Sequence, residues 1–150
     1  MIATSVGYDL VFLVHVMTAV AVLIVLIAMR TAADAVARGA DAPTQARRLP
    51  KGPNWAARLV HLLPVTGLVL ALTGDASVSL DHAWVIVGIV LYVLAAGHLE
   101  ARTLPLEAEV AREAAREGRA PAGEGRRLRL SVDTGLALIA LALITMLVQF

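Results

Sequence analysis

The sequence predicts an all-α membrane protein: one polytopic four-helix bundle over residues 1–150, with N-out/C-out topology and short cytoplasmic surface helices. Apolar residues make up 59% of the chain and the mean hydropathy is +0.77, whereas soluble domains are about 45–50% apolar. Four long apolar runs each approach the roughly 20 residues that cross a bilayer. All 13 Lys and Arg residues fall in two of the segments that separate these runs.

The first two predicted spans are residues 8–29 and 56–74. The first is uncharged between Asp9 and Arg30, which suits a hydrocarbon core of about 30 Å at about 1.5 Å per helical residue. The second follows Trp55, a residue type that prefers the membrane–water interface. Both runs therefore predict transmembrane helices.

The last two predicted spans are residues 83–103 and 130–149. Trp84 anchors the beginning of the third span, and the fourth carries Asp133 within its first turns. A lone carboxylate at depth in a bilayer costs a few kcal/mol. We therefore expect Asp133 to face the bundle or the interface, with a polar partner in reach: His61, His98, or a basic residue such as Arg58 or Arg129.

The positions of the cationic residues predict the orientation. Loop 30–58 holds six Lys and Arg residues and loop 100–130 holds seven, which together are all 13 in the chain. Positive charge resists translocation, so both loops are predicted to be cytoplasmic and the protein to be a multi-pass protein of the bacterial inner membrane.

The two basic loops contain helical segments of their own. Good helix formers at 31–38 are expected to prolong the first span and to end at Gly39, before a linker over 39–53 that contains Gly and Pro. Residues 106–117 predict a second surface helix because Glu and Arg recur three residues apart. Residues 118–125 read as a flexible break before the fourth span.

Three histidines lie within predicted spans, where an ionisable residue is a candidate functional site. His15, in the first span, suits a simple hydrogen bond to a neighbouring helix; the alternative is a haem ligand or a proton carrier. His61 and His98 lie at similar depth near the cytoplasmic ends of the second and third spans. They could form a bis-His haem site or part of a proton relay.

Charged residues at the same level complete a predicted polar cluster: Glu100, Asp133 and Arg58. The plainer interpretation of this cluster is an interfacial layer that meets headgroups and water, because long side chains at helix ends commonly reach the interface.

Several site classes are excluded. The chain has no Cys, which rules out disulfides, thiolate metal ligands and iron–sulfur clusters. It has no nucleotide-binding glycine pattern, no zinc-protease motif and no Ser–His–Asp set at matched depth. We predict no metal site and no catalytic residues. Nucleic-acid binding is not expected, because Glu residues balance the basic loops and topology explains them.

Short segments resemble known families. Leu13-Val14-His15-Val16 is similar to the first span of small bacterial four-span membrane proteins, and Thr73-Gly74, Trp84 and Arg102-Thr103-Leu104-Pro105 follow in the same order. These proteins are an uncharacterised "predicted integral membrane protein" family, the copper-resistance D-like proteins and the four-span protoporphyrinogen IX oxidases. In the oxidases a first-span His, matched here by His15, helps to hold haem. Their essential third-span Lys has no counterpart here, so the resemblance does not imply oxidase activity.

The leading functional hypothesis is a non-enzymatic accessory or structural component of an inner-membrane assembly. Its expected partners are membrane lipids and either other membrane protein subunits or further copies of the chain, and no cofactor is predicted. The alternatives are a haem-binding redox protein that uses His61 with His98, or His15 with an exogenous ligand, and a small transporter. A transporter would need an aqueous path through the mainly Leu, Val and Ala interior.

Overall fold

The computed structural model describes residues 2–73 and 82–148, with side chains from Val6 onward. Every regular element in these two ranges is helical, which confirms the all-α expectation. The elements in chain order are α1 (Ile2–Ala37), α2 (Ala42–Arg48), the 3₁₀ helix η1 (Ala57–His61), α3 (Leu62–Thr73), α4 (Ala83–His98), the π-helical turn η2 (Leu99–Thr103), α5 (Leu104–Glu117) and α6 (Ala122–Val148).

Three helices are long and apolar enough to cross a membrane. They are α1, α6 and the continuous helix of α4, η2 and α5, which runs from Ala83 to Glu117. The segment Ala57–Thr73, made of η1 and α3, is apolar but shorter. The chain therefore has the helices of a membrane protein, as its composition predicts.

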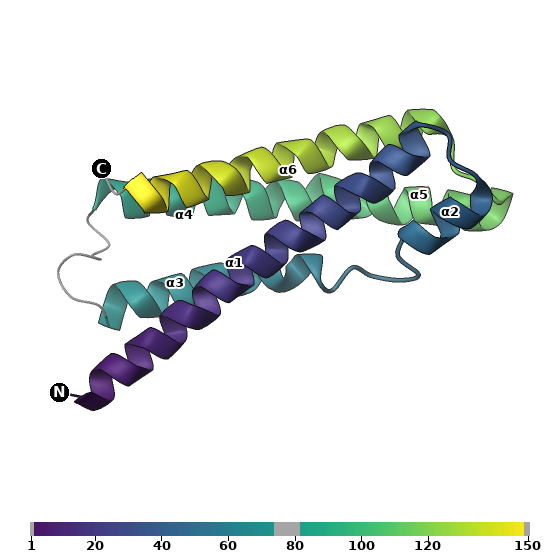
Figure 1. Cartoon of the computed structure of the whole chain (residues 1–150). Helices are drawn as coiled ribbons and strands as arrows, with labels where there is room; N and C mark the ends of the chain where they lie inside the picture. The colour runs from purple at the N-terminus through teal and green to yellow at the C-terminus, as the bar shows by residue number, and fades with distance from the viewer. Residues whose placement is uncertain (1, 74–81, 149–150) are drawn as a thin grey trace.

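The helices pack side by side in the order α3, α1, α6, α4 rather than in a closed ring. α6 packs against both α1 and α4, and α3 packs chiefly against α1. Figure 1 shows α1 crossing the molecule obliquely, beside α3 in its first half and beside α6 in its second half. Val22, Leu26, Leu128 and Val132 are buried in the core that these helices share.

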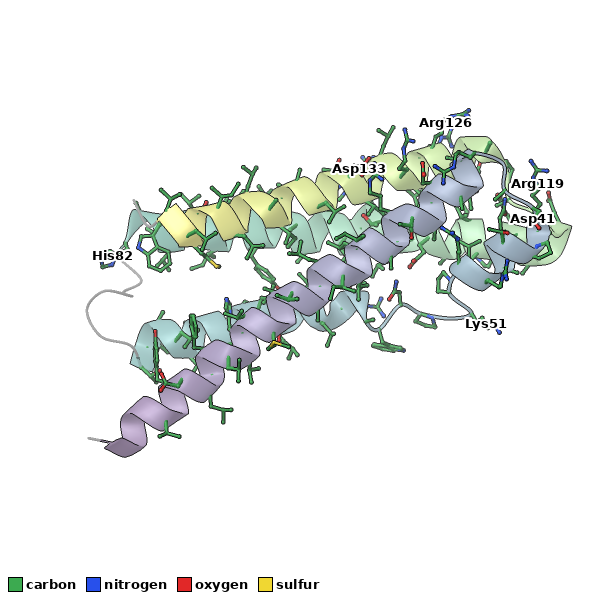
Figure 2. The ribbon with its side chains drawn as sticks, viewed as in Figure 1. Asp41, Lys51, His82, Arg119, Arg126 and Asp133 are labelled. Atoms are coloured by element: carbon green, nitrogen blue, oxygen red, sulfur yellow. The ribbon has the colours of Figure 1, made fainter. Side chains whose placement is uncertain are left out.

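One end of the molecule carries the basic residues, and we call it the basic end. It consists of the last turns of α1, all of α2 and α5, and the first turns of α6. Figure 2 shows Lys51, Arg119 and Arg126 at this end and His82 at the opposite end. Buried apolar residues such as Val36 and Val110 pack between the helices at this end.

The end of α1 confirms the sequence prediction. Gly39 has φ +70°, a left-handed conformation that glycine adopts without steric cost. The Gly39 amide donates to the Val36 carbonyl, and the Ala40 amide to the Ala35 carbonyl. This pair of bonds is the Schellman motif, which satisfies carbonyls that the helix end would otherwise leave unpaired.

Two details of the basic end differ from the sequence prediction. The linker expected at 39–53 contains helix α2, which has Pro43 in its first turn and is followed by the buried Leu49. The flexible break expected at 118–125 is shorter, because α6 begins at Ala122 and places Gly125 inside the helix. Pro43 stands where a helix accepts proline, and the buried Gln45 and Gly125 indicate that packing stabilises both helical segments.

The π-helical turn η2 ends at Thr103, two residues before Pro105. Proline has no amide hydrogen and its ring clashes with the carbonyl four residues earlier, so a regular α-helical bond from position 105 cannot form. Widening the turn over Leu99–Thr103 lets one helix continue from α4 into α5. The surface helix predicted at 106–117 is thus a continuation of α4 through the widened turn and not a separate helix.

Candidate functional site: polar contacts between helices

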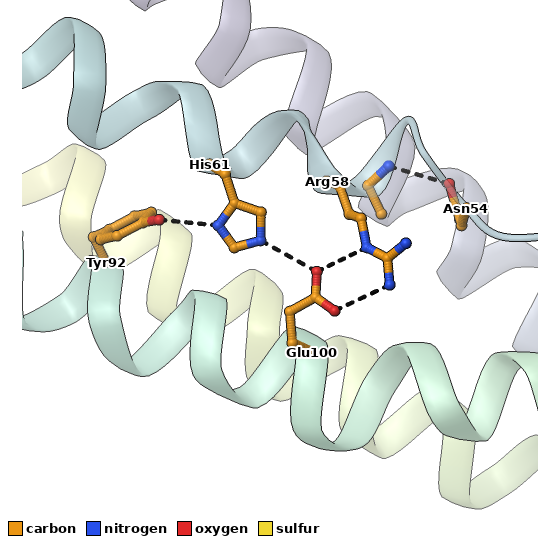
Figure 3. Close-up of polar contacts among 6 residues, drawn as sticks. Asn54, Arg58, His61, Tyr92 and Glu100 are labelled. Carbon is orange, nitrogen blue, oxygen red and sulfur yellow. Dashed lines mark hydrogen bonds and ion pairs between the residues drawn. The ribbon is translucent and has the colours of Figure 1, made fainter.

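A polar network connects η1 to Tyr92 on α4 and to Glu100 on η2 (Figure 3). Arg58 donates from Nε and Nη2 to the two oxygens of Glu100, at 2.9 and 3.2 Å. His61 bonds the same carboxylate through Nε2 at 3.2 Å and the Tyr92 hydroxyl through Nδ1 at 3.1 Å. The four side chains form one chain of hydrogen bonds, Tyr92–His61–Glu100–Arg58, in which the arginine–carboxylate pair is bidentate.

The residues before η1 extend this connection. The Asn54 side-chain oxygen accepts the Ala57 amide at 3.1 Å, which caps the first turn of η1. Its side-chain nitrogen donates to both oxygens of Glu107 on α5, at 3.2 and 3.1 Å. The Arg58 guanidinium lies 5.0 Å from the centre of the exposed Trp55 ring, within cation–π range. Segment 54–61 therefore forms hydrogen bonds with side chains of α4, η2 and α5.

A second network joins α4 and η2 to α6. His98 Nε2 contacts the Ser131 carbonyl oxygen at 2.9 Å and the Ser131 hydroxyl at 3.1 Å. The Ser131 hydroxyl also lies 2.9 Å from the hydroxyl of the buried Thr103. His98 thus bonds to α6, whereas His61 bonds to Tyr92 on α4 and Glu100 on η2, and within residues 2–73 and 82–148 the two histidines share no hydrogen-bond partner.

His15 belongs to a third contact, between α1 and α3. Its Nδ1 lies 2.7 Å from the Thr66 hydroxyl. A Cβ on Gly67, the next residue, would lie 3.4 Å from the His15 ring, so the glycine leaves room for the imidazole. This contact is an interhelical hydrogen bond of the kind that the plainer interpretation of His15 expects.

Ion pairs join α1 to α6 near the basic end. Arg30 Nε donates to Asp133 at 2.6 Å, and Arg129 donates to Asp34 at 3.2 Å. Asp34 also pairs with Arg38 on its own helix. Asp133 therefore has a basic partner, as expected, but that partner is Arg30. The structure separates Asp133 from the Arg58–Glu100 pair, with which the sequence grouped it.

These polar contacts are distributed over several different interfaces between elements. The sequence singled out His15, His61, His98, Glu100 and Asp133, but it gave no role to their partners Tyr92, Thr66, Ser131, Thr103 and Arg30. Polar side chains at matching depth were the only signal for these partners. The rotation of each helix, which decides the pairing, cannot be counted from residue spacing.

The interior between the networks is small and apolar. A cavity where α1, η1, α4 and α6 meet measures about 10 Å³, which leaves room for at most one water molecule. Val22, Leu26, Val60 and Leu99 are among its lining residues. The arrangement can transfer a proton along the Tyr92–His61–Glu100 chain, but this cavity does not extend it into an aqueous path.

No known protein family matches the chain, and no curated protein or solved structure shows significant similarity to it. The resemblance to the four-span families stays an expectation drawn from the residues quoted above.

Proposed function

We propose that this chain is a non-catalytic component of the bacterial inner membrane that docks laterally against another membrane helix. In this proposal residues 8–29, 56–74, 83–103 and 130–149 cross the bilayer in N-out/C-out orientation, with the basic end in the cytoplasm. The docking surface is the outward side of α3 and α4, and it receives either another subunit or a second copy of the chain.

The hydrogen-bond partners of the ionisable residues support a structural role for these residues, which are the ones that a catalytic mechanism would need. The bond of His15 joins α1 to α3, that of His98 joins α4 to α6, and the bond of Arg58 to Glu100 joins η1 to η2. Polar groups inside a membrane protein commonly serve in this way, because interhelical hydrogen bonds satisfy them. The ionisable residues are distributed over the helix contacts instead of converging on one substrate-sized pocket.

The observation that carries the docking proposal is the apolar exposure of α3 and α4. Each of these helices has one long-helix neighbour, α1 for α3 and α6 for α4. Large apolar side chains on both helices are exposed by a third or more: Val65, Leu68, Leu72, Ile86, Ile89, Val90, Val93 and Leu94. Gly97 adds a position with no atom near its absent Cβ, where a partner helix can approach closely.

The bis-His form of the haem alternative, with His61 and His98 as the two ligands, requires a rearrangement of the networks. An axial ligand needs one imidazole nitrogen free for iron, whereas both nitrogens of His61 have partners and His98 Nε2 contacts Ser131. A bis-His haem would also have to bring His61 and His98 to a common point from their different partners. The reduced and oxidised visible absorption spectra of the purified protein distinguish this alternative.

The topology is tested by cysteine labelling, because the chain has no native Cys. We expect Thr44→Cys and Ala120→Cys to be protected from an impermeant thiol reagent on intact cells and Ser77→Cys to be labelled. Ser77 lies outside the described residues, in the segment between the second and third predicted spans. Ala120 is buried, so lysed and denatured cells provide the control for its reactivity. The reverse labelling pattern would invert the proposed orientation.

The docking surface is tested by photocrosslinking in native membranes. A benzophenone side chain placed at Leu68 on α3 or at Val90 on α4 should give one discrete protein adduct at each position. Ile144 on α6 is the matched control, with 54% exposure against 50% and 52% for the two test positions. We expect it to give lipid adducts only.

The mass of the adduct identifies the partner. Twice the mass of the chain indicates a second copy, and any other discrete mass indicates a different subunit. Lipid adducts alone at all three positions, or the same protein adduct at Ile144, would refute α3 and α4 as the docking surface.

A further inference from the structure

An open groove lies between α1 and the segment that connects α2 to η1. Its volume is about 500 Å³. One wall consists of residues Ile24, Val25, Ala28 and Met29 on α1, and the other is the chain from Arg48 to Ala56. This feature, which we call the α1 groove, shares Asn54, Trp55 and Glu107 with the contacts around η1, but none of its lining residues belongs to α3 or α4, where the docking surface is proposed.

The two parts of the α1 groove differ in chemistry. The α1 wall belongs to the apolar run that ends at Arg30, and Ile24 lies about 9 Å before that residue along the helix axis. The opposite wall carries two cations three residues apart, Arg48 and Lys51. Trp55, 70% exposed, completes the lining with the residue type that favours the interface.

The two cations are available to a ligand. Arg48 donates one bond, from Nη1 to the Thr31 carbonyl at 3.3 Å, and this places the guanidinium beside α1. Neither Arg48 nor Lys51 forms an ion pair within residues 2–73 and 82–148. The one acidic residue of the lining, Glu107, is 4% exposed and accepts both hydrogen bonds of the Asn54 amide. The open side of the groove is therefore cationic.

We propose that the α1 groove binds one anionic glycerophospholipid of the leaflet on the basic side, with its phosphate between Arg48 and Lys51 and an acyl chain along Ile24 and Ala28. Basic pockets beside transmembrane helices recognise such headgroups, and the adjoining apolar wall provides the surface for the chain. Zwitterionic lipids have no net charge to complement the two cations. The proposal depends on the chain being membrane-embedded, but not on lateral docking through α3 and α4.

Native mass spectrometry of the purified protein in detergent tests the headgroup. Titration with phosphatidylglycerol should retain one lipid per chain at concentrations where phosphatidylcholine is not retained. Combining Arg48→Gln with Lys51→Gln should weaken phosphatidylglycerol binding about tenfold or more, since each cation near the surface contributes about 1 kcal/mol. Arg126→Gln with Arg127→Gln removes the same charge from α6, outside the groove lining, and should leave binding unchanged.

A second pair of variants tests the acyl chain and keeps every charge. Ala28→Phe places a ring on the apolar wall and should weaken phosphatidylglycerol binding several-fold. Ile27→Phe is the matched control, because Ile27 is the exposed neighbour and does not line the groove. Circular dichroism establishes that each variant is folded. If the double variant unfolds, the single variant Lys51→Gln tests the headgroup in its place, because it changes an exposed loop residue.

Three results would overturn the proposal. Equal retention of phosphatidylcholine would show that charge is not recognised. Equal loss in the Arg126/Arg127 pair would show that binding follows net charge and not the groove. Displacement of the lipid by millimolar inorganic phosphate, together with unchanged binding in Ala28→Phe, would show a simple anion site. None of these results bears on the photocrosslinks at α3 and α4, so the two proposals fail independently.

Discussion

Replacing Gly125 by alanine is expected to lower the free energy of unfolding by about 2–4 kcal/mol, because the new methyl group has no room. A Cβ at this position would lie 2.7 Å from the Val36 carbonyl carbon and 2.8 Å from the Val36 Cβ, and it would overlap the Ala37 amide nitrogen. Two of these atoms belong to the backbone of α1, so the clash cannot be relieved by a side-chain rotation. The last turn of α1 and the first turn of α6 would have to move apart.

Gly135→Ala is the matched control on the same helix. A Cβ there has nothing within 4 Å, and alanine has a higher helix propensity than glycine by about 1 kcal/mol. We therefore expect Gly135→Ala to be neutral or stabilising. Equilibrium unfolding in mixed micelles of increasing denaturing-detergent fraction, followed by circular dichroism, measures both variants. Equal stability of the two alanine variants would contradict the close α1–α6 approach.

Replacing Gln45 by leucine is expected to weaken the connection between α2 and the segment before α6 at the basic end. The free energy of unfolding should fall by about 2–4 kcal/mol, because buried backbone groups lose their hydrogen-bond partners. Gln45 is fully buried on α2. Its oxygen accepts the Ala120 amide at 2.8 Å, and its nitrogen donates to the carbonyls of Ala40 at 3.2 Å and Ala120 at 3.4 Å. One side chain thus connects the two basic segments, and leucine would leave these backbone groups without partners.

Hydrogen exchange distinguishes this local effect from global unfolding. The amides of α2 and of the connection before α6 should exchange faster in Gln45→Leu, while the core of α6 near Val132 should change little. Arg47→Leu is the control, because it changes an exposed residue of the same short helix. If both variants exchanged alike, the Gln45 amide would have no special role in joining the two segments.

The sequence by itself determined the class of the protein and the helices. Apolar runs of the right length have few alternatives to helix, because a bilayer leaves no water for unpaired backbone groups. The left-handed glycine at 39 ends α1 where the composition predicts, and the Glu–Arg spacing predicts the helix that appears as α5. The predicted membrane spans 8–29 and 83–103 fall within two of the three long apolar helices, and α6 contains the fourth predicted span from residue 130 to Val148, the last residue that the structure describes. These features are local, so a local pattern is sufficient to predict them.

Only the tertiary structure decided which polar residues meet. Residue counting places His61, His98, Glu100 and Asp133 at one depth, but depth leaves open the rotation of each helix about its axis. The 3₁₀ helix η1, which precedes Pro64, and the π-helical turn η2, which precedes Pro105, change that rotation. Neither turn produces a periodic pattern in the sequence, so residue counting does not reveal the change. Glu100 consequently meets Arg58, whereas Asp133 faces Arg30 on α1. Long-range partners follow from packing, and packing is a property of the whole chain.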